Sequence, residues 1–140
     1  MIYLDNSAST KPRKEVINVL VQTMEENYAN PDAIHDFSHK TLLKIKNAKK
    51  IISDYLKVEA DRIYFTAGGG DGNNLVLQGI INANSRIKKH LITTKIEHPS
   101  VYEVFKHYEN LGFEVDYLNV DKDGFIDIEE LENTIREDTV

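Results

Sequence analysis

Three consecutive glycines at residues 68–70 constrain the fold of this chain more than any other feature, because they separate two different hydrophobic periods. Before them, Ile63 and Phe65 alternate with polar residues, as in a short strand. After them, apolar residues recur at helical spacing, at Leu75, Val76, Leu77, Ile80 and Ile81. Residues 62–74 therefore predict a strand, a glycine turn and the start of a helix.

The predicted glycine turn could bind an anion. Glycines let backbone N–H groups approach a ligand, and the first turn of a helix offers unpaired N–H groups at the positive end of its dipole. A phosphate group would suit such a turn. The same residues equally allow a plain strand-to-helix turn with Asp71 as its cap. Neither common nucleotide signature is present, since the chain has no Gly-Lys-Ser/Thr here and no G-x-G-x-x-G spacing.

Two helices are predicted before the glycine turn. Pro12 marks the start of the first, in which Val16, Leu20 and Met24 form an apolar stripe at helical spacing. The second has one apolar face, made by Leu42, Ile45, Ala48, Ile52 and Leu56. Lysines surround that face and are most simply a solvated helix surface.

Strands and helices alternate after the glycine turn. Residues 91–94 and 114–120 follow strand patterns, with a helix between Pro99 and Gly112 and a last helix at residues 128–135. Together with the strand at 63–65, this order predicts an α/β fold. We expect a mainly parallel three-stranded sheet with flanking helices and right-handed crossovers.

Composition narrows the class of protein. A chain of 140 residues, 41% hydrophobic and 29% charged, suits one globular domain. The net charge of −6 argues against general nucleic-acid binding. No apolar run approaches the roughly 20 residues of a membrane span, and the first residues lack a signal-peptide pattern, so we expect a cytoplasmic protein without a membrane partner. The absence of cysteine excludes disulfides, thiolate metal sites and a cysteine nucleophile within this chain.

His98 is the candidate catalytic residue. It follows the strand at 91–94, at the carboxyl end of a strand, where ligands of open α/β sheets collect. Its flat imidazole could stack on an aromatic ligand or transfer a proton near neutral pH. The alternative is a local helix cap or a surface residue. The other four histidines share no spacing, and we assign them no site.

Residues 119–130 fit the template of a calcium loop. Oxygen side chains occupy positions one, three, five and nine, glycine occupies six and glutamate twelve. The flank does not fit, because residues 114–118 alternate as a strand does, whereas a calcium hand needs a helix there. We interpret the segment as a strand-to-helix turn, assign no metal ligands, and keep a calcium-binding module as an alternative.

Together these segments resemble the amino-terminal part of the cysteine desulfurases, pyridoxal-phosphate enzymes of the class V aminotransferase group. The matching pieces occur in family order from end to end. They are Tyr3-Leu4-Asp5-Asn6 with Ala8 and Thr10, Asn30-Pro31 with Ile34-His35, Phe65-Thr66 with Gly68-Gly69 and Asn73-Asn74-Leu75, His90 to Thr94 with Glu97-His98, Gly112 to Val115, and Asp123-Gly124.

The resemblance implies an amino-terminal arm at 1–13 and a truncated fold-type I large domain at 14–140. In that domain Gly69 and Gly70 would cradle the phosphate of pyridoxal phosphate, and His98 would stack on its ring and take part in proton transfer. The family converts L-cysteine to L-alanine and an enzyme-bound persulfide for iron–sulfur cluster or thiocofactor synthesis. A sulfur-acceptor protein would then be a partner.

The chain departs from the family at the glycine turn. Gly70 stands where the family has a threonine whose hydroxyl would bond the phosphate, a contact worth roughly 1.5–3 kcal/mol. Asp71 replaces a longer glutamate, and Gly72 weakens the helix start by up to about 1 kcal/mol. We expect weakened cofactor binding.

The Schiff-base lysine and the persulfide cysteine of the family have no counterpart in these 140 residues, so we expect a fragment that does not turn over cysteine by itself. In the family sheet the strand at 63–65 lies apart from the other two, which would leave bare edges. We therefore expect rearranged strand pairing or a covering partner, and a homo-oligomer. The alternatives are a fragment of a class V aminotransferase or selenocysteine lyase, and a non-catalytic interaction module.

Overall fold

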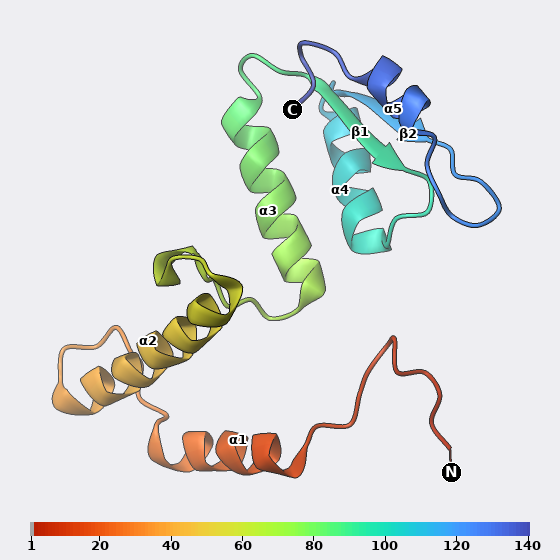
Figure 1. Cartoon of the computed structure of the whole chain (residues 1–140). Coiled ribbons are helices and arrows are strands. Elements are labelled where there is room, and N and C mark those ends of the chain that lie inside the picture. The colour runs from red at the N-terminus through yellow and green to blue at the C-terminus, as the bar shows by residue number, and fades with distance from the viewer. Residues whose placement is uncertain (1) are drawn as a thin grey trace. The chain divides into compact units, whose positions relative to one another are not determined.

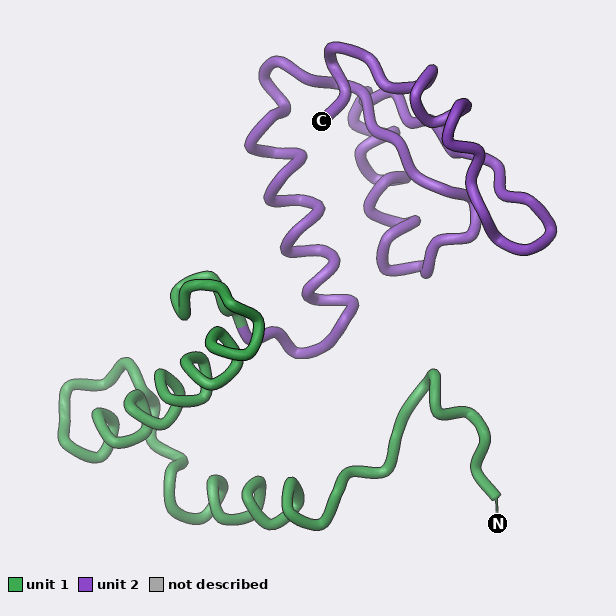
Figure 2. Tube along the Cα trace, viewed as in Figure 1, with its two compact units in different colours: residues 1–64 green, residues 65–140 purple. Residues whose placement is uncertain are grey.

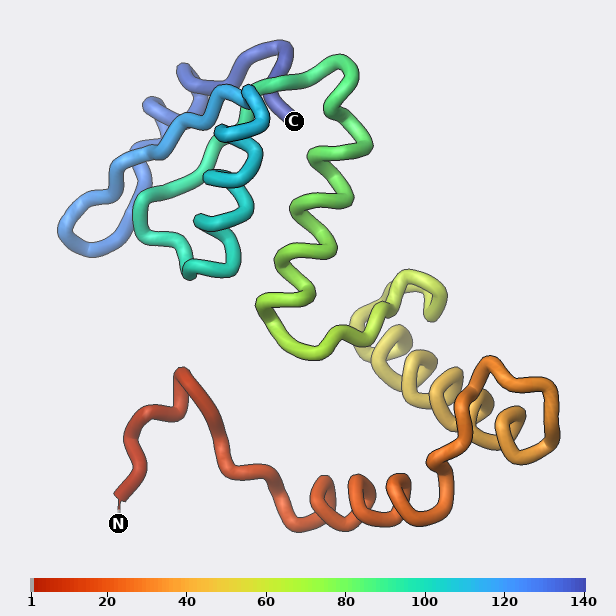
Figure 3. The backbone as a smooth tube through the Cα atoms, turned by 180° about the vertical axis from the view of Figure 1, so that it is seen from behind, coloured from red at the N-terminus to blue at the C-terminus, as the bar shows by residue number. Residues whose placement is uncertain are grey.

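The computed structural model describes residues 2–140, which form two compact units with a boundary between Tyr64 and Phe65 (Figure 2). Helices make up the first unit, whereas the second combines helices with parallel strands (Figures 1 and 3). Residues 2–13 contain neither helix nor strand. Within residues 2–140, no helix has both the length and the apolar character needed to cross a bilayer.

The first unit confirms the two predicted helices. Helix α1 spans Lys14–Glu26 and begins two residues after Pro12, and α2 spans Asp36–Leu56. The side chain of His35 caps α2 by accepting a hydrogen bond from the backbone N–H of Ser38. A short 3-10 helix, η1, follows at Ala60–Arg62 and packs against α2.

The second unit begins with α3, Gly69–Asn84, and continues with β1, His90–Thr94, and α4, Pro99–Asn110. Strand β2, Glu114–Leu118, and α5, Ile128–Thr134, complete it. The two strands are parallel, with His90 opposite Glu114 and Thr94 opposite Leu118. Pro99 lies in the first turn of α4, as predicted, because a proline there gives up no helical hydrogen bond.

The predicted three-stranded sheet is corrected to a two-stranded one. Residues 63–65 have no strand assignment, although the backbone of Ile63 is extended. An extended segment becomes a strand only when a neighbouring backbone pairs with it in a ladder, whereas the N–H of Ile63 here donates to the carbonyl of Ala60 and closes η1. The alternation at Ile63 and Phe65 therefore predicted the extended backbone at Ile63 correctly, but its prediction of a third paired strand was wrong.

The opposite edge of β1 carries the last residues of the chain. The N–H of His90 donates to the carbonyl of Asp138, and the N–H of Val140 donates to the carbonyl of His90. Strand β2 pairs with the other edge of β1, where the N–H of Glu114 donates to the carbonyl of Lys89. Strand β1 is thus flanked on both sides.

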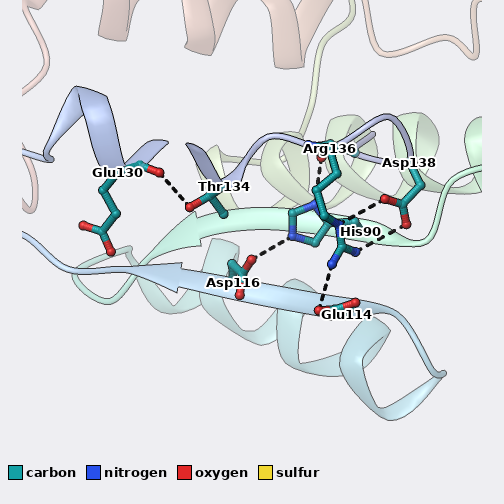
Figure 4. A network of polar contacts seen from close by, with 8 residues as sticks. His90, Glu114, Asp116, Glu130, Thr134, Arg136 and Asp138 are labelled. Atoms are coloured by element: carbon teal, nitrogen blue, oxygen red, sulfur yellow. Dashed lines mark hydrogen bonds and ion pairs between the residues drawn. The ribbon is translucent and has the colours of Figure 1, made fainter. Parts of the chain in front are cut away.

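One apolar core lies beside the sheet and between α3 and α4. Its buried members are Ile81, Leu91, Val104, Phe105, Tyr108 and Phe113. Helices α4 and α5 lie on opposite faces of the strands (Figure 4). This follows from right-handed crossovers that proceed in opposite directions, one from β1 to β2 and one from β2 back past β1.

Candidate cofactor site

The start of α3 offers backbone donors. Helix geometry leaves the N–H groups of Gly69, Gly70 and Asp71 without partners inside the helix. The N-cap position is Gly68 and has no side-chain cap, so Asp71 is not the cap that the sequence suggested; its carboxylate instead turns back from the first turn and accepts the N–H of Ala67 at 3.0 Å. The turn therefore combines free amides at the positive end of the helix dipole with one carboxylate at its rim.

The glycines of this turn are not required by the chain's own packing. A Cβ added at Gly68 or Gly69 would meet nothing within 4 Å, and one at Gly70 would lie 3.7 Å from Cβ of Ser100, an ordinary contact. None of the three has a φ in the left-handed region. Space for a ligand against bare backbone is therefore present, and tight local geometry does not explain the triple glycine.

His98 stands at the start of α4, directly after the loop that follows β1. Its side chain is exposed, and its Nδ1 accepts the N–H of Ser100 at 3.1 Å, so it caps the helix. Nδ1 therefore carries no proton, and in the neutral ring the proton resides on Nε2. Within residues 2–140 no group bonds that Nε2, which leaves it available to a ligand.

Ser100 joins the two helix starts. Its hydroxyl accepts a hydrogen bond from the side-chain amide of Asn73 at 2.9 Å and lies 2.9 Å from Nδ1 of His98. Because the amide of Asn73 can only donate, the Ser100 hydroxyl proton points to His98. The structure thus places the sequence-predicted residues Gly69, Gly70 and His98 at neighbouring helix N-termini, and Ser100 links the two helices by bonding Asn73 on α3 and His98 at the start of α4.

Comparison with known proteins shows which family the sequence of this chain matches. The family model Aminotransferase class-V matches residues 2–140 of the chain. The chain belongs to the class-V aminotransferase family. Among class-V relatives, the cysteine desulfurase IscS of Methanosarcina thermophila is 42% identical and that of Dictyoglomus turgidum 40% identical. Each match covers 99% of this chain, but 34% and 35% of the respective relative.

Solved structures of related proteins have the same fold as this chain. A NifS-like protein superposes with a TM-score of 0.90 at 31% identity, covering 96% of this chain and 37% of that one. The structure named SspA in complex with cysteine superposes with a TM-score of 0.86 at 36% identity, and the match covers 94% of this chain and 38% of that one. These neighbours are fold-type I pyridoxal-phosphate enzymes, so the predicted family and fold class are confirmed. The chain spans about a third of the length of the relatives it matches.

Sequence reasoning did not assign roles to Asn73 and Ser100. Asn73 belongs to a segment that carried the class-V resemblance, and Ser100 stands two residues after His98, where a helix-capping partner is expected. Those signals could have suggested local capping. They could not have shown that the two residues bond each other, because 27 positions separate them in the chain.

A second polar network lies around His90, on the face of β1 that α5 covers (Figure 4). His90 is fully buried; its Nδ1 lies 2.7 Å from Oγ1 of Thr139 and its Nε2 3.0 Å from Oδ2 of Asp116. Arg136 forms ion pairs with Glu114 at 2.9 Å and Asp138 at 3.1 Å. Both bonds of the buried ring are satisfied, so His90 anchors the end of the chain to the sheet.

Two of the oxygen side chains in the calcium-like segment 119–130, those of Asp121 and Asp127, bond backbone N–H groups. Oδ1 of Asp121 accepts the N–H groups of Asp123 and Phe125, and Oδ1 of Asp127 caps α5. Strand β2 leads into the segment, as predicted, in place of the helix that a calcium hand needs. Within residues 2–140, no three histidine, aspartate or glutamate side chains gather as metal ligands.

Proposed function

We propose that this chain is the amino-terminal part of a pyridoxal-phosphate-dependent cysteine desulfurase, in which Gly69, Gly70 and His98 supply part of the cofactor site. The observation that carries the proposal is that the hydroxyl of Ser100 bonds both Asn73, in the helix that the glycine turn begins, and His98. The relatives' names support the choice of reaction. The family's broader chemistry leaves a class V aminotransferase or selenocysteine lyase as the alternative.

The residues present fit the cofactor. Unpaired amides at a helix start suit a phosphate dianion, and bare backbone gives it room. The exposed ring of His98 is able to stack on a flat heteroaromatic ligand and to hold a proton on Nε2. Bound pyridoxal phosphate supplies the electron sink for reactions of amino acids. The rim carboxylate of Asp71 and the missing hydroxyl at Gly70 both lower the affinity for phosphate.

We further propose that the 140 residues alone do not turn over L-cysteine. They contain no cysteine, so they supply no thiolate to receive sulfur, and the family lysine has no counterpart here. The domain at 14–140 would act with other polypeptide, in the cytoplasm, and transfer sulfur to an acceptor protein only when completed.

Self-association is part of the proposal. Many large apolar side chains among residues 2–140 are exposed to solvent. The exposed fractions of Ile34, Ile87 and Phe125, for example, are 104%, 86% and 71%. Soluble monomers rarely leave extended apolar surface in water. A homo-oligomer would cover some of it.

Binding of pyridoxine 5′-phosphate tests the cofactor site. This analogue lacks the aldehyde that reacts with surface lysines, so calorimetry reports the phosphate and ring contacts alone. Gly70→Thr should tighten binding by about tenfold or more, because a hydroxyl bond to a charged group contributes roughly 1.5–3 kcal/mol. Gly79→Thr, in the same helix but away from its first turn, is the matched control and should leave affinity unchanged.

Two variants separate the roles of His98. His98→Asn keeps a side chain able to cap α4 and removes the ring, so it should preserve stability and weaken binding. His98→Ala should lower both. Equal affinity in the wild type, Gly70→Thr and His98→Asn would overturn the proposed site.

A further inference from the structure

Three polar side chains at the starts of α3 and α4 form one hydrogen-bond network. The amide nitrogen of Asn73 lies 2.9 Å from the hydroxyl oxygen of Ser100, and that oxygen lies 2.9 Å from Nδ1 of His98. A serine hydroxyl has a single proton, so it donates to at most one of these two neighbours. The direction of the network therefore decides which nitrogen of the imidazole carries a proton.

A backbone group fixes that direction. The N–H of Ser100 points at Nδ1 of His98 with a nitrogen-to-nitrogen distance of 3.1 Å, and the planar peptide bond holds its proton in place. Because one proton already faces Nδ1, that nitrogen presents its lone pair. The Ser100 hydroxyl, also at hydrogen-bond distance, then donates to Nδ1, and its oxygen accepts from the amide of Asn73.

The consequence lies at the other nitrogen of the ring. A neutral imidazole whose Nδ1 is bare carries its proton on Nε2 and offers that N–H as a donor. For Nε2 of His98 to accept a proton, the ring would first have to protonate Nδ1. That change would break both bonds from Ser100, including the one that caps α4.

We propose that Asn73 and Ser100 are positioning residues that hold His98 as a hydrogen-bond donor toward the bound ligand. Ser100 fixes the ring through Nδ1. Asn73 acts through Ser100, because its amide occupies the serine oxygen and keeps the hydroxyl proton on the side of His98. The ligand atom that meets Nε2 is then an acceptor, such as an anionic oxygen. The role toward a ligand rests on the proposed cofactor site, whereas the direction of the network does not.

Nitrogen NMR of the full chain, without ligand, tests the direction. At alkaline pH, where an imidazole is neutral, His98 should show a bare Nδ1 and a protonated Nε2. Ser100→Ala should move the Nδ1 signal toward that of an imidazole nitrogen with fewer donors. His107, an exposed histidine of the same helix, should keep its signals. A wild type protonated on Nδ1 would overturn the proposal.

Asn73→Asp tests the part played by Asn73. Its carboxylate only accepts, so the Ser100 hydroxyl should turn toward it, and the Nδ1 signal of His98 should move as in Ser100→Ala. Asn74→Asp is the matched control. It adds the same charge one residue later, where the side chain bonds within α3, and should leave the ring signals unchanged. An unchanged Nδ1 signal in Asn73→Asp would remove Asn73 from the proposal.

Calorimetry with two ligands tests the positioning role. Ser100→Ala should weaken binding of pyridoxine 5′-phosphate by about fivefold, the effect of one ordinary hydrogen bond, because the ring of His98 is held less firmly. Binding of inorganic phosphate, which needs only the glycine turn, should not change. Ser100→Thr retains a hydroxyl and should restore the affinity for the analogue.

The two ligands also separate this inference from the proposed cofactor site. Equal weakening of both ligands in Ser100→Ala would mean that the helix starts have moved apart, and unchanged binding of both would mean that the hydroxyl has no effect. Either result would overturn the positioning role. A wild type that binds neither ligand would overturn the cofactor site and the role toward its ligand, while the NMR signals of His98 would still decide the direction of the network.

Discussion

The side-chain amide of Asn73 donates a 2.9 Å hydrogen bond to the hydroxyl of Ser100, and this bond ties α3, near its start, to the first turn of α4. The two helices contribute the glycine turn and His98 respectively. This bond, together with the apolar core that α3 and α4 share, holds the anion donors near the imidazole.

Removal of the Ser100 hydroxyl should weaken the connection between the starts of α3 and α4. Ser100→Ala leaves the amide of Asn73 without its acceptor, and we expect a loss of about 1 kcal/mol in the free energy of unfolding. Ser85→Ala removes a serine hydroxyl that bonds only a carbonyl three residues earlier, and it should cost less than about 0.5 kcal/mol. Urea denaturation measures both. Equal costs would show that the Asn73–Ser100 bond contributes nothing specific.

The buried His90 network makes a second prediction. The N–H of Arg136 donates to Oγ1 of Thr139, which faces Nδ1 of His90. Thr139→Val keeps the shape and removes the hydroxyl, so a buried ring nitrogen loses its partner, at a cost of about 1–3 kcal/mol. Hydrogen exchange at Val140, whose N–H bonds the carbonyl of His90, should accelerate in the variant.

The control for Thr139 is Thr134→Val. Thr134 donates its hydroxyl to the carbonyl of Glu130 within α5, whereas the ring of His90 bonds Thr139 and Asp116. Thr134→Val should therefore leave hydrogen exchange at the N–H of Val140 unchanged. Unaltered exchange at Val140 in Thr139→Val would mean that backbone bonds alone hold the end of the chain.

Tyr117 on β2 makes stability depend on alkaline pH. Its hydroxyl is buried and finds no hydrogen-bond partner among residues 2–140; burial raises the pKa of Tyr117, the charge of Glu109 adds to the rise, and the Lys106 ammonium opposes it. A raised pKa in the folded state means that the folded chain holds this proton more tightly than the unfolded chain. The resulting stability is present below the ordinary pKa of about 10 and is lost as pH rises through the folded-state pKa.

Tyr117→Phe should therefore leave stability at pH 7 unchanged or slightly higher, because the lost hydroxyl had no partner. Above pH 10 the wild type should lose more stability than the variant. Tyr55→Phe, at a tyrosine that is 86% exposed, is the control and should follow the wild type across the range. Denaturant midpoints at pH 7 and above pH 10 provide the comparison, and parallel curves for wild type and Tyr117→Phe would contradict the prediction.

Local patterns predicted much of the fold. The apolar stripe from Val16 to Met24 indicated α1, and Pro99 and Gly112 bracketed α4 where the structure has it. These signals succeed because helix periodicity, proline at a first turn and a glycine of positive φ each depend on a few neighbouring residues. The strand predicted at Ile63 and Phe65 failed for the complementary reason, since pairing requires a distant backbone.

The sequence by itself determined the family, the order of helices and strands from the glycine turn onward, and the placement of His98 and the glycines at helix starts. Only the tertiary structure decided that these two starts meet through Asn73 and Ser100, and that His90 is buried beneath Thr139, 49 positions away. Periodicity reports which face of an element is apolar, but hydrogen bonds between remote side chains arise only once packing has placed those faces against each other.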